Sequence, residues 1–177
     1  MQLNRMPSRV ELVEYYGDNK LTNAIKRYPG GYYAIASELG LEMKESDTNY
    51  GKLQERIAIE TLTSMGYDVK HMVQNHPYDL LVNNCLKIDV KMSRLYNGNA
   101  GSFYSCNLEK PFCTCDIYII YLLNDDFSTK DILIIPSKFI YSNTQIGIGE
   151  KTSKYYVYSN RWDFIQSYVE FFESIIV

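Results

Sequence analysis

The chain has 177 residues, a hydrophobic content of 46% and a formal net charge of −3. This length suffices for one ordinary core and a small additional module, but two full domains would be cramped. No apolar run approaches the roughly 18 residues of a membrane-spanning helix, and the start lacks the apolar segment of a signal peptide. We therefore expect a soluble, cytoplasmic protein.

The acidic balance excludes a broad basic surface. Residues 1–50 carry six Lys/Arg against seven Asp/Glu, and residues 51–177 carry twelve against fourteen. Because phosphate contacts normally leave a basic footprint, any surface for nucleic acid must be local.

The cysteines do not predict a metal site. They are Cys85, Cys106, Cys113 and Cys115, which form no paired CxxC units. No histidine lies near the last two, so a four-ligand zinc site is disfavoured. We expect reduced and mostly buried thiols.

Residues 1–49 are predicted to form a separate helical module. Pro7-Ser8 can open a first helix, residues 21–27 a second, and residues 32–39 a third that ends at Gly40. The acidic segment 43–48 is typical of a linker, so residues 50–177 form the second predicted domain.

The second domain begins with a predicted helix over residues 51–65, closed by Gly66. Its apolar arc consists of Ala58, Ile59, Leu62 and Met65. Glu55 projects within this arc, whereas Glu60 lies on the opposite side, four residues from Arg56, as a solvated ion pair would. A carboxylate that faces the core is costly unless it is paired or binds a metal, so Glu55 is the informative acid.

Two short strands follow. In residues 85–93, one side carries Leu86, Ile88, Val90 and Met92, and the other carries Lys87, Asp89, Lys91 and Ser93. Residues 77–82 form a second strand with Asp79 near its start, and Asn83-Asn84 supplies a tight turn between the two. Two carboxylates and a lysine on adjacent strands predict a divalent-metal site.

The remaining pattern predicts further elements in order. They are a strand at 67–73, a loop at 95–101, a strand at 103–108, a hairpin of 116–123 with 131–135, a helical turn at 136–141, a polar tail at 142–154, a strand at 155–158, and a helix at 161–176. In the last helix, Trp162, Ile165, Val169 and Phe172 share one face.

The ordered set of a helix with Glu55, Pro77-Tyr78-Asp79 and Asp89-Val90-Lys91 resembles the PD-(D/E)XK nuclease superfamily. This superfamily includes restriction enzymes, Holliday-junction resolvases and some homing endonucleases. Its pattern is an acid on the first helix, an Asp that opens the second strand, and (D/E)-X-K on the third. The resemblance covers roughly residues 51–140 and implies an α/β, restriction-endonuclease-like core with a mixed central sheet flanked by helices.

The resemblance also implies roles. Asp79 and Asp89 would bind one or two Mg²⁺ ions, with Mn²⁺ as a substitute, and the carbonyl of Val90 would reach the same metal. Glu55 would add an outer-shell or second-metal contact. Lys91 would orient or deprotonate water, or stabilise the transition state. Because carboxylates nearby favour a charged lysine, we expect orientation and electrostatics from Lys91.

Three further residues are candidate contacts around this set. His76 is a candidate phosphate contact or acid–base group, the alternative being a solvated loop histidine. Lys87 shares the face of Lys91 and could contact backbone phosphate. Ser93 lies on the same face and could support the site.

The amino-terminal module has a resemblance of its own. Met6-Pro7-Ser8 and residues 23–28 and 30–41 are similar to a small helical repeat associated with some homing endonucleases, and residues 35–41 resemble half of a helix-turn-helix. This similarity implies DNA contacts from Lys20, Lys26, Arg27, Tyr32 and Tyr33. The alternative is a packing or interaction module without DNA contact.

The combined resemblances imply a Mg²⁺-dependent DNA endonuclease that acts at a specific site, of the homing or mobile-element type. The alternatives are a junction-resolving or restriction-like nuclease, or a non-catalytic regulator on the same fold, and RNA stays open as a substrate. Cutting two strands with one site per chain implies a homodimer or larger symmetric assembly. The apolar face of the carboxy-terminal helix and the tyrosine-rich strands are candidate interfaces.

Overall fold

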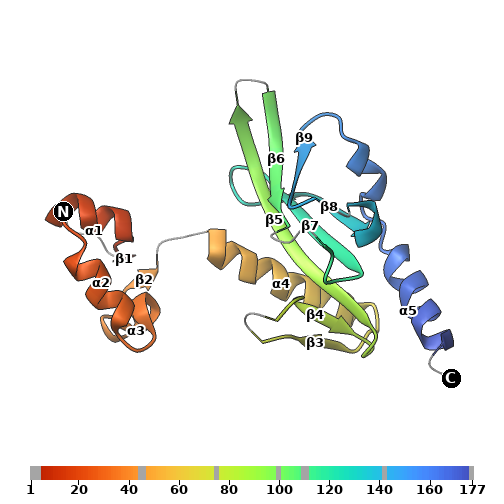
Figure 1. Cartoon of the computed structure of the whole chain (residues 1–177), viewed down its shortest axis with the longest axis horizontal. Coiled ribbons are helices and arrows are strands. Elements are labelled where there is room, and N and C mark those ends of the chain that lie inside the picture. The colour runs from red at the N-terminus through yellow and green to blue at the C-terminus, as the bar shows by residue number, and fades with distance from the viewer. Residues whose placement is uncertain are drawn as a thin grey trace. The chain divides into compact units, whose positions relative to one another are not determined.

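The structure is a computed structural model that describes residues 5–43, 47–73, 76–98, 101–108, 112–140 and 143–175. The chain divides into two compact units, Met1–Asp47 and Thr48–Val177 (Figure 1). Half of the predicted linker, residues 44–46, lies outside the described residues.

The amino-terminal unit contains three short helices at the predicted places. They are α1 (Arg9–Tyr16), α2 (Lys20–Arg27) and α3 (Gly31–Glu38). Ser8 caps α1 in a capping box with Glu11, which satisfies backbone donors at the helix start. A core of Met6, Leu12, Ile25 and Ala36 joins the helices. The short parallel pair of β1 (Arg5–Met6) and β2 (Glu42–Met43) is not among the predicted elements.

The second unit begins with α4 (Asp47–Ser64), which starts four residues before the predicted Gly51. Its fully buried positions are Gln54, Ala58 and Leu62, spaced four apart, so one stripe of the helix faces the core. The prediction that Met65 belongs to the apolar arc is wrong. Met65 follows the last helical residue and is 44% exposed.

A seven-stranded mixed sheet forms the centre of this unit. Its strands are β3 (Val69–His71), β4 (Leu80–Val82), β5 (Leu86–Gly98), β6 (Gly101–Asn107), β7 (Ile117–Leu123), β8 (Thr129–Pro136) and β9 (Gln145–Gly149). The long strand β5 organises the sheet, because it pairs antiparallel with β4, parallel with β7 and antiparallel with β6 (Figure 1). The predicted α/β class with a central sheet flanked by helices is confirmed.

The two faces of the sheet have separate cores. One face packs on α4 and on α5 (Asp163–Ile175), with Ile88 and Ile119 at its centre. The other face packs around Tyr104, Ile148 and the short 3₁₀ helix η2 (Lys154–Tyr158). Ile165 and Val169 of α5 are buried, as their shared face predicts. Because side chains alternate along β5, its charged residues point to the second face.

The turn between β4 and β5 has the predicted form. Asn83 and Asn84 have φ angles of 47° and 57°. Two consecutive positive φ values are typical of the type I′ turns that join two-residue hairpins, and asparagine tolerates this conformation. The turn sets the register of β4 on β5, with Leu80 opposite Ile88.

Three predictions for the rest of the chain are wrong. The expected loop 95–101 continues β5 to Gly98, because Leu95 and Tyr96 pair with Tyr104 and Phe103 of β6. The expected polar tail contains β9, whose Ile146 and Ile148 are buried against β6. The expected strand 155–158 is η2, which Ser153 caps through the backbone amide of Tyr155.

The short helical turn predicted after Pro136 is present as η1 (Ser137–Phe139). The four cysteines are free, and Cys106 and Cys115 are buried as expected. None of the helices in the described ranges has the length and apolar character needed to cross a membrane.

Candidate active site

The site is built on the loop that leads into β4. The backbone N–H of Asp79 donates to the carbonyl of Ile88 at 3.0 Å. Its carboxylate Oδ2 accepts from the backbone N–H of Val90 at 2.7 Å. At the amino-terminal end of β4, the Asp79 side chain therefore accepts the hydrogen bond that a main-chain carbonyl would accept if β4 extended further along β5. This bond fixes Asp79 against the middle of β5.

Neighbouring segments hold this loop in place. The hydroxyl of Thr114 donates to the carbonyl of Pro77, and the backbone N–H of Met72 donates to the carbonyl of Asp79 at 2.8 Å. The loop is thus held by the residue after β3 on one side and by the 112–116 segment on the other.

Asp89 lies beside Asp79 on β5 and is only 8% exposed. Nζ of Lys91 lies 3.0 Å from Oδ2 of Asp89, with side-chain exposures of 19% and 11%. The Asp79 carboxylate lies close enough to act on the charge of Asp89, so Asp79, Asp89 and Lys91 come together at one place. This is the convergence that the strand pattern predicts for these three residues.

Burial dominates the electrostatics of Asp89. Burial raises its pKa most strongly, the Lys91 ammonium lowers it and the Asp79 carboxylate raises it, and the balance puts the pKa of this carboxyl at about 7. Tyr118 of β7 lies opposite Asp89 in the sheet and is buried. Burial raises the pKa of the Cys115 thiol, and the nearby Asp89 carboxylate raises it further. Two acids in one dry position favour a proton or a cation between them.

The carbonyl of Val90 faces the gap next to Asp79, on the β4 side of β5. In an extended strand, the N–H and C=O of one residue point to the same side. The N–H of Val90 is directed to Asp79 and away from β7. The oxygens of Asp79, Asp89 and Val90 form a donor set of the kind that hard divalent cations prefer.

Glu55 lies outside this set. Its carboxylate Oε2 is 2.9 Å from Nε2 of His71, and its side chain is 23% exposed. Within the described ranges, no three His, Cys, Asp or Glu side chains are grouped closely enough to hold a metal. Arg56 and Glu60 form the predicted exposed pair, with atoms 3.8 Å apart.

The three surrounding candidates differ in exposure. Lys87 is exposed, with Nζ 5.9 Å from the ring centre of Tyr78. His76 contacts the edge of the same ring, at 4.3 Å between ring centres. Ser93 is buried, and its hydroxyl donates to the Ser105 carbonyl and accepts from the Ser105 N–H. Ser93 therefore joins β5 to β6 and does not present its hydroxyl to a ligand.

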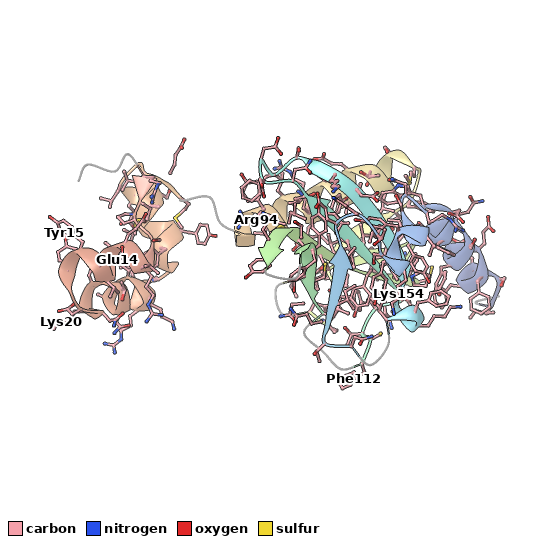
Figure 2. All side chains as sticks on the ribbon, turned by 90° about the horizontal axis from the view of Figure 1, so that it is seen from above. Glu14, Tyr15, Lys20, Arg94, Phe112 and Lys154 are labelled. Atoms are coloured by element: carbon pink, nitrogen blue, oxygen red, sulfur yellow. The ribbon has the colours of Figure 1, made fainter. Side chains whose placement is uncertain are left out.

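In the amino-terminal unit the basic candidates are accessible. Lys20, Lys26 and Arg27 of α2 are exposed, as is Tyr33 of α3, whereas Tyr32 is partly buried. Lys20 lies 3.3 Å from Asp18 and projects from the unit (Figure 2). The unit thus offers basic side chains along one helix.

Sequence reasoning missed two polar residues near these elements. His71 holds Glu55, and its signal was its place on an edge strand paired with β4. Gln54 is 2% exposed, and its Oε1 has no hydrogen-bond partner within the described ranges. Its spacing of four and eight residues from Ala58 and Leu62 places it on the buried stripe.

Comparison with solved structures gives a likeness of fold. No family model and no curated protein matches the chain. Among solved structures, the chain is similar to a bacterial homing endonuclease, I-Ssp6803I, with 18% sequence identity and a TM-score of 0.55. The match covers 73% of this chain and 98% of the other. At this identity the likeness concerns the fold alone, and it agrees with the mixed central sheet flanked by helices.

We predict that Asp89→Asn stabilises the protein without added metal. The amide keeps the shape of the side chain and removes a buried charge, so the free energy of unfolding at mildly alkaline pH should rise by about 1–2 kcal/mol. Urea denaturation in chelator measures it, with exposed Glu60→Gln as the control. A loss of stability in Asp89→Asn would mean that its pairing with Lys91 outweighs its burial.

Proposed function

We propose that the chain is a divalent-metal-dependent DNA endonuclease of the PD-(D/E)XK type. The observation that carries this proposal is the convergence of Asp79, Asp89 and Lys91 where β4 and β5 separate. Its order along the chain, helix acid, Asp and Asp-X-Lys, agrees with that family. The likeness of the fold to a bacterial homing endonuclease supports the same conclusion.

Asp79, Asp89 and the carbonyl of Val90 would hold Mg²⁺, with Mn²⁺ as a substitute. When bound, the cation supplies a Lewis acid that polarises the scissile phosphate and favours attack by water. Asp89 fixes the ammonium group of Lys91 at 3.0 Å. Lys91 then presents a charged donor at the place where negative charge develops, and it orients the attacking water. Tyr118 and Cys115, which are buried next to Asp89, limit the access of bulk water to these carboxylates.

We further propose that the amino-terminal unit contributes DNA contacts that direct the cut to a specific site. The exposed Lys26 and Arg27 lie in the last turn of α2. Long basic side chains on one helix suit phosphate contacts, which set register and orientation on a duplex. A homing or mobile-element enzyme fits this arrangement. A junction-resolving or restriction-like enzyme would use the same active site on another substrate.

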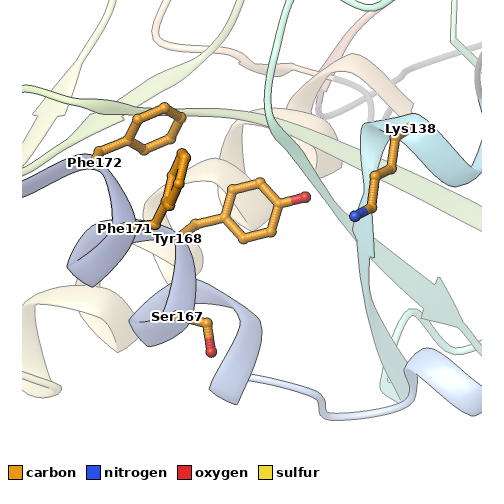
Figure 3. Close-up of a pocket in the computed structure, with 5 residues that line it drawn as sticks. All are labelled: Lys138, Ser167, Tyr168, Phe171 and Phe172. Atoms are coloured by element: carbon orange, nitrogen blue, oxygen red, sulfur yellow. The ribbon is translucent and has the colours of Figure 1, made fainter. Parts of the chain in front are cut away.

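Cleavage of both strands would need two copies of the site. The predicted apolar face of α5 is not available as an interface, because Ile165 and Val169 are buried in the core, so the exposed side of this helix is our candidate. Phe171 and Ile175 of α5 are 59% and 60% exposed. The same helix borders a hollow of about 330 Å³, across which it faces Lys138 (Figure 3). The residues of α5 that line this hollow are Ser167, Tyr168, Phe171 and Phe172. A second copy of the chain would cover this apolar surface through a two-fold interface.

The nuclease proposal predicts Mg²⁺-dependent cutting that requires both strand residues. Purified protein is assayed on supercoiled plasmid, branched DNA and RNA, with Mg²⁺ or Mn²⁺. Asp89→Ala and Lys91→Ala should each reduce the rate by about a hundredfold or more, since each removes a charge that acts on the transition state. Glu60→Gln is the control that retains activity. DNA binding without cleavage of any substrate would favour a non-catalytic regulator, and cleavage of RNA alone would change the substrate class.

The site-specificity proposal predicts a change in the salt dependence of binding. The double variant Lys26→Ala/Arg27→Ala should bind duplex DNA more weakly, with the slope of log K against log salt reduced by about 1–2. Fluorescence anisotropy over a salt series measures it. The matched control, Lys151→Ala/Lys154→Ala, removes two cations from the second unit. Equal losses in both doubles would indicate a general charge effect.

The interface proposal predicts that Phe171→Glu and Ile175→Glu yield monomers. A carboxylate placed on each side of a two-fold contact is repelled and desolvated. Analytical ultracentrifugation of wild type and variants measures the mass, with Val10→Glu, at a residue 64% exposed in the other unit, as control. A monomeric wild type at all concentrations, with and without DNA, would remove this interface.

A further inference from the structure

Glu55 and His71 form a pair that differs from the Arg56–Glu60 ion pair on the same helix. Their atoms are 2.9 Å apart, with side-chain exposures of 23% and 55%. Arg56 and Glu60 are 3.8 Å apart and more than two-thirds exposed. A short contact with one partly buried partner restricts both side chains, whereas an exposed pair contributes little.

This pair is separate from the carboxylates that would bind a metal. The groups that shift the pKa of Asp89 are Lys91 and Asp79, and Glu55 is not among them. Glu55 also joins no group of three potential ligands in the described ranges. Its carboxylate is engaged by an imidazole.

The pair nevertheless adjoins the site through the sheet. His71 of β3 lies opposite Leu80 of β4, so both side chains point to the face that α4 covers. The next residue, Met72, donates its N–H to the carbonyl of Asp79 at 2.8 Å. His71 therefore flanks the end of β4 at which Asp79 is placed.

We propose that Glu55 acts through His71 and not through the metal, and that it positions His71 to contact a DNA phosphate beside the cleavage site. This inference rests on the proposed nuclease function. It assigns the helix acid a role different from the metal contact implied by the family resemblance. Within it, Glu55 is a positioning residue and His71 is the DNA contact.

The chemistry of the two groups supports this division. A carboxylate only accepts hydrogen bonds, so Nε2 of His71 carries the donated proton. The other ring nitrogen belongs to a side chain that is 55% exposed. A carboxylate that holds one ring nitrogen orients the ring and balances its charge when the second nitrogen donates to an anion. In an acidic chain, such a local hydrogen-bond donor to phosphate matters for DNA affinity.

The first test separates Glu55 from the metal. Mn²⁺ binding to the full-length protein without DNA is measured by isothermal titration calorimetry. Glu55→Gln and His71→Ala should change the Mn²⁺ affinity by less than about twofold, whereas Asp79→Asn should weaken it by about tenfold or more. A tenfold loss in Glu55→Gln would make Glu55 a metal ligand and overturn the proposal.

The second test uses the sign of a charge effect. Duplex DNA binding in chelator is measured by fluorescence anisotropy. Removing an acid normally strengthens DNA binding, and the matched control Glu60→Gln should do so or show no change. Glu55→Gln should instead weaken binding by about three- to fivefold, as should His71→Ala, and the double variant should lose no more than either.

Two outcomes would count against the proposal alone. Stronger DNA binding by Glu55→Gln, or unchanged binding by His71→Ala, would show that the pair does not contact DNA, even if the wild type cuts it. A wild type that neither binds Mn²⁺ nor cuts or binds DNA would instead remove the proposed function itself. The two failures are therefore distinguishable.

Discussion

The hydrogen bond from the Val90 N–H to the Asp79 carboxylate is the interaction on which the site depends. Strand β4 has only three residues, so it ends before it reaches the middle of β5. The Asp79 side chain satisfies the backbone donor that this early ending leaves on β5, and a buried donor without a partner would be costly. The same bond brings Asp79 beside Asp89 and opens the gap that the Val90 carbonyl faces. One hydrogen bond therefore both satisfies the backbone of β5 and assembles the site.

Strand β5 keeps packing and chemistry apart by simple alternation. Ile88 and Val90 join the core under α4 and α5, while Asp89 and Lys91 point to the other face. The apolar side of β5 can thus be packed tightly without moving the charges. Pairing with β7 over seven residues holds the strand straight through the site. Asp89 is buried by its neighbours, which makes the site dry enough for charge interactions to be strong.

Short-range patterns predicted most of this arrangement. Alternation gave β5, the Asn83-Asn84 turn gave the hairpin, and Ser8 gave the start of α1, because each is decided by nearby residues. The failures need distant partners. Residues 95–98 have the composition of a loop but form part of β5, because they pair with β6. Tyr155 is buried in a 3₁₀ helix that the local sequence does not predict. Glu55 was placed on the correct helix, but its partner His71 lies 16 residues away on an edge strand.

The net charge of −3 does not decide whether this chain binds DNA. Charges in water are screened beyond a Debye length of about 8 Å, so a phosphate responds to local groups and not to the sum. Several acids are engaged within the chain, including Glu11 by Arg5 and Asp163 by Arg161. The helix α2 carries three basic residues and no acid. Over most of its surface, an acidic protein with such local basic sites would have only weak non-specific affinity for DNA. Its affinity would therefore depend on a few defined contacts, which favours recognition of a particular site over general binding.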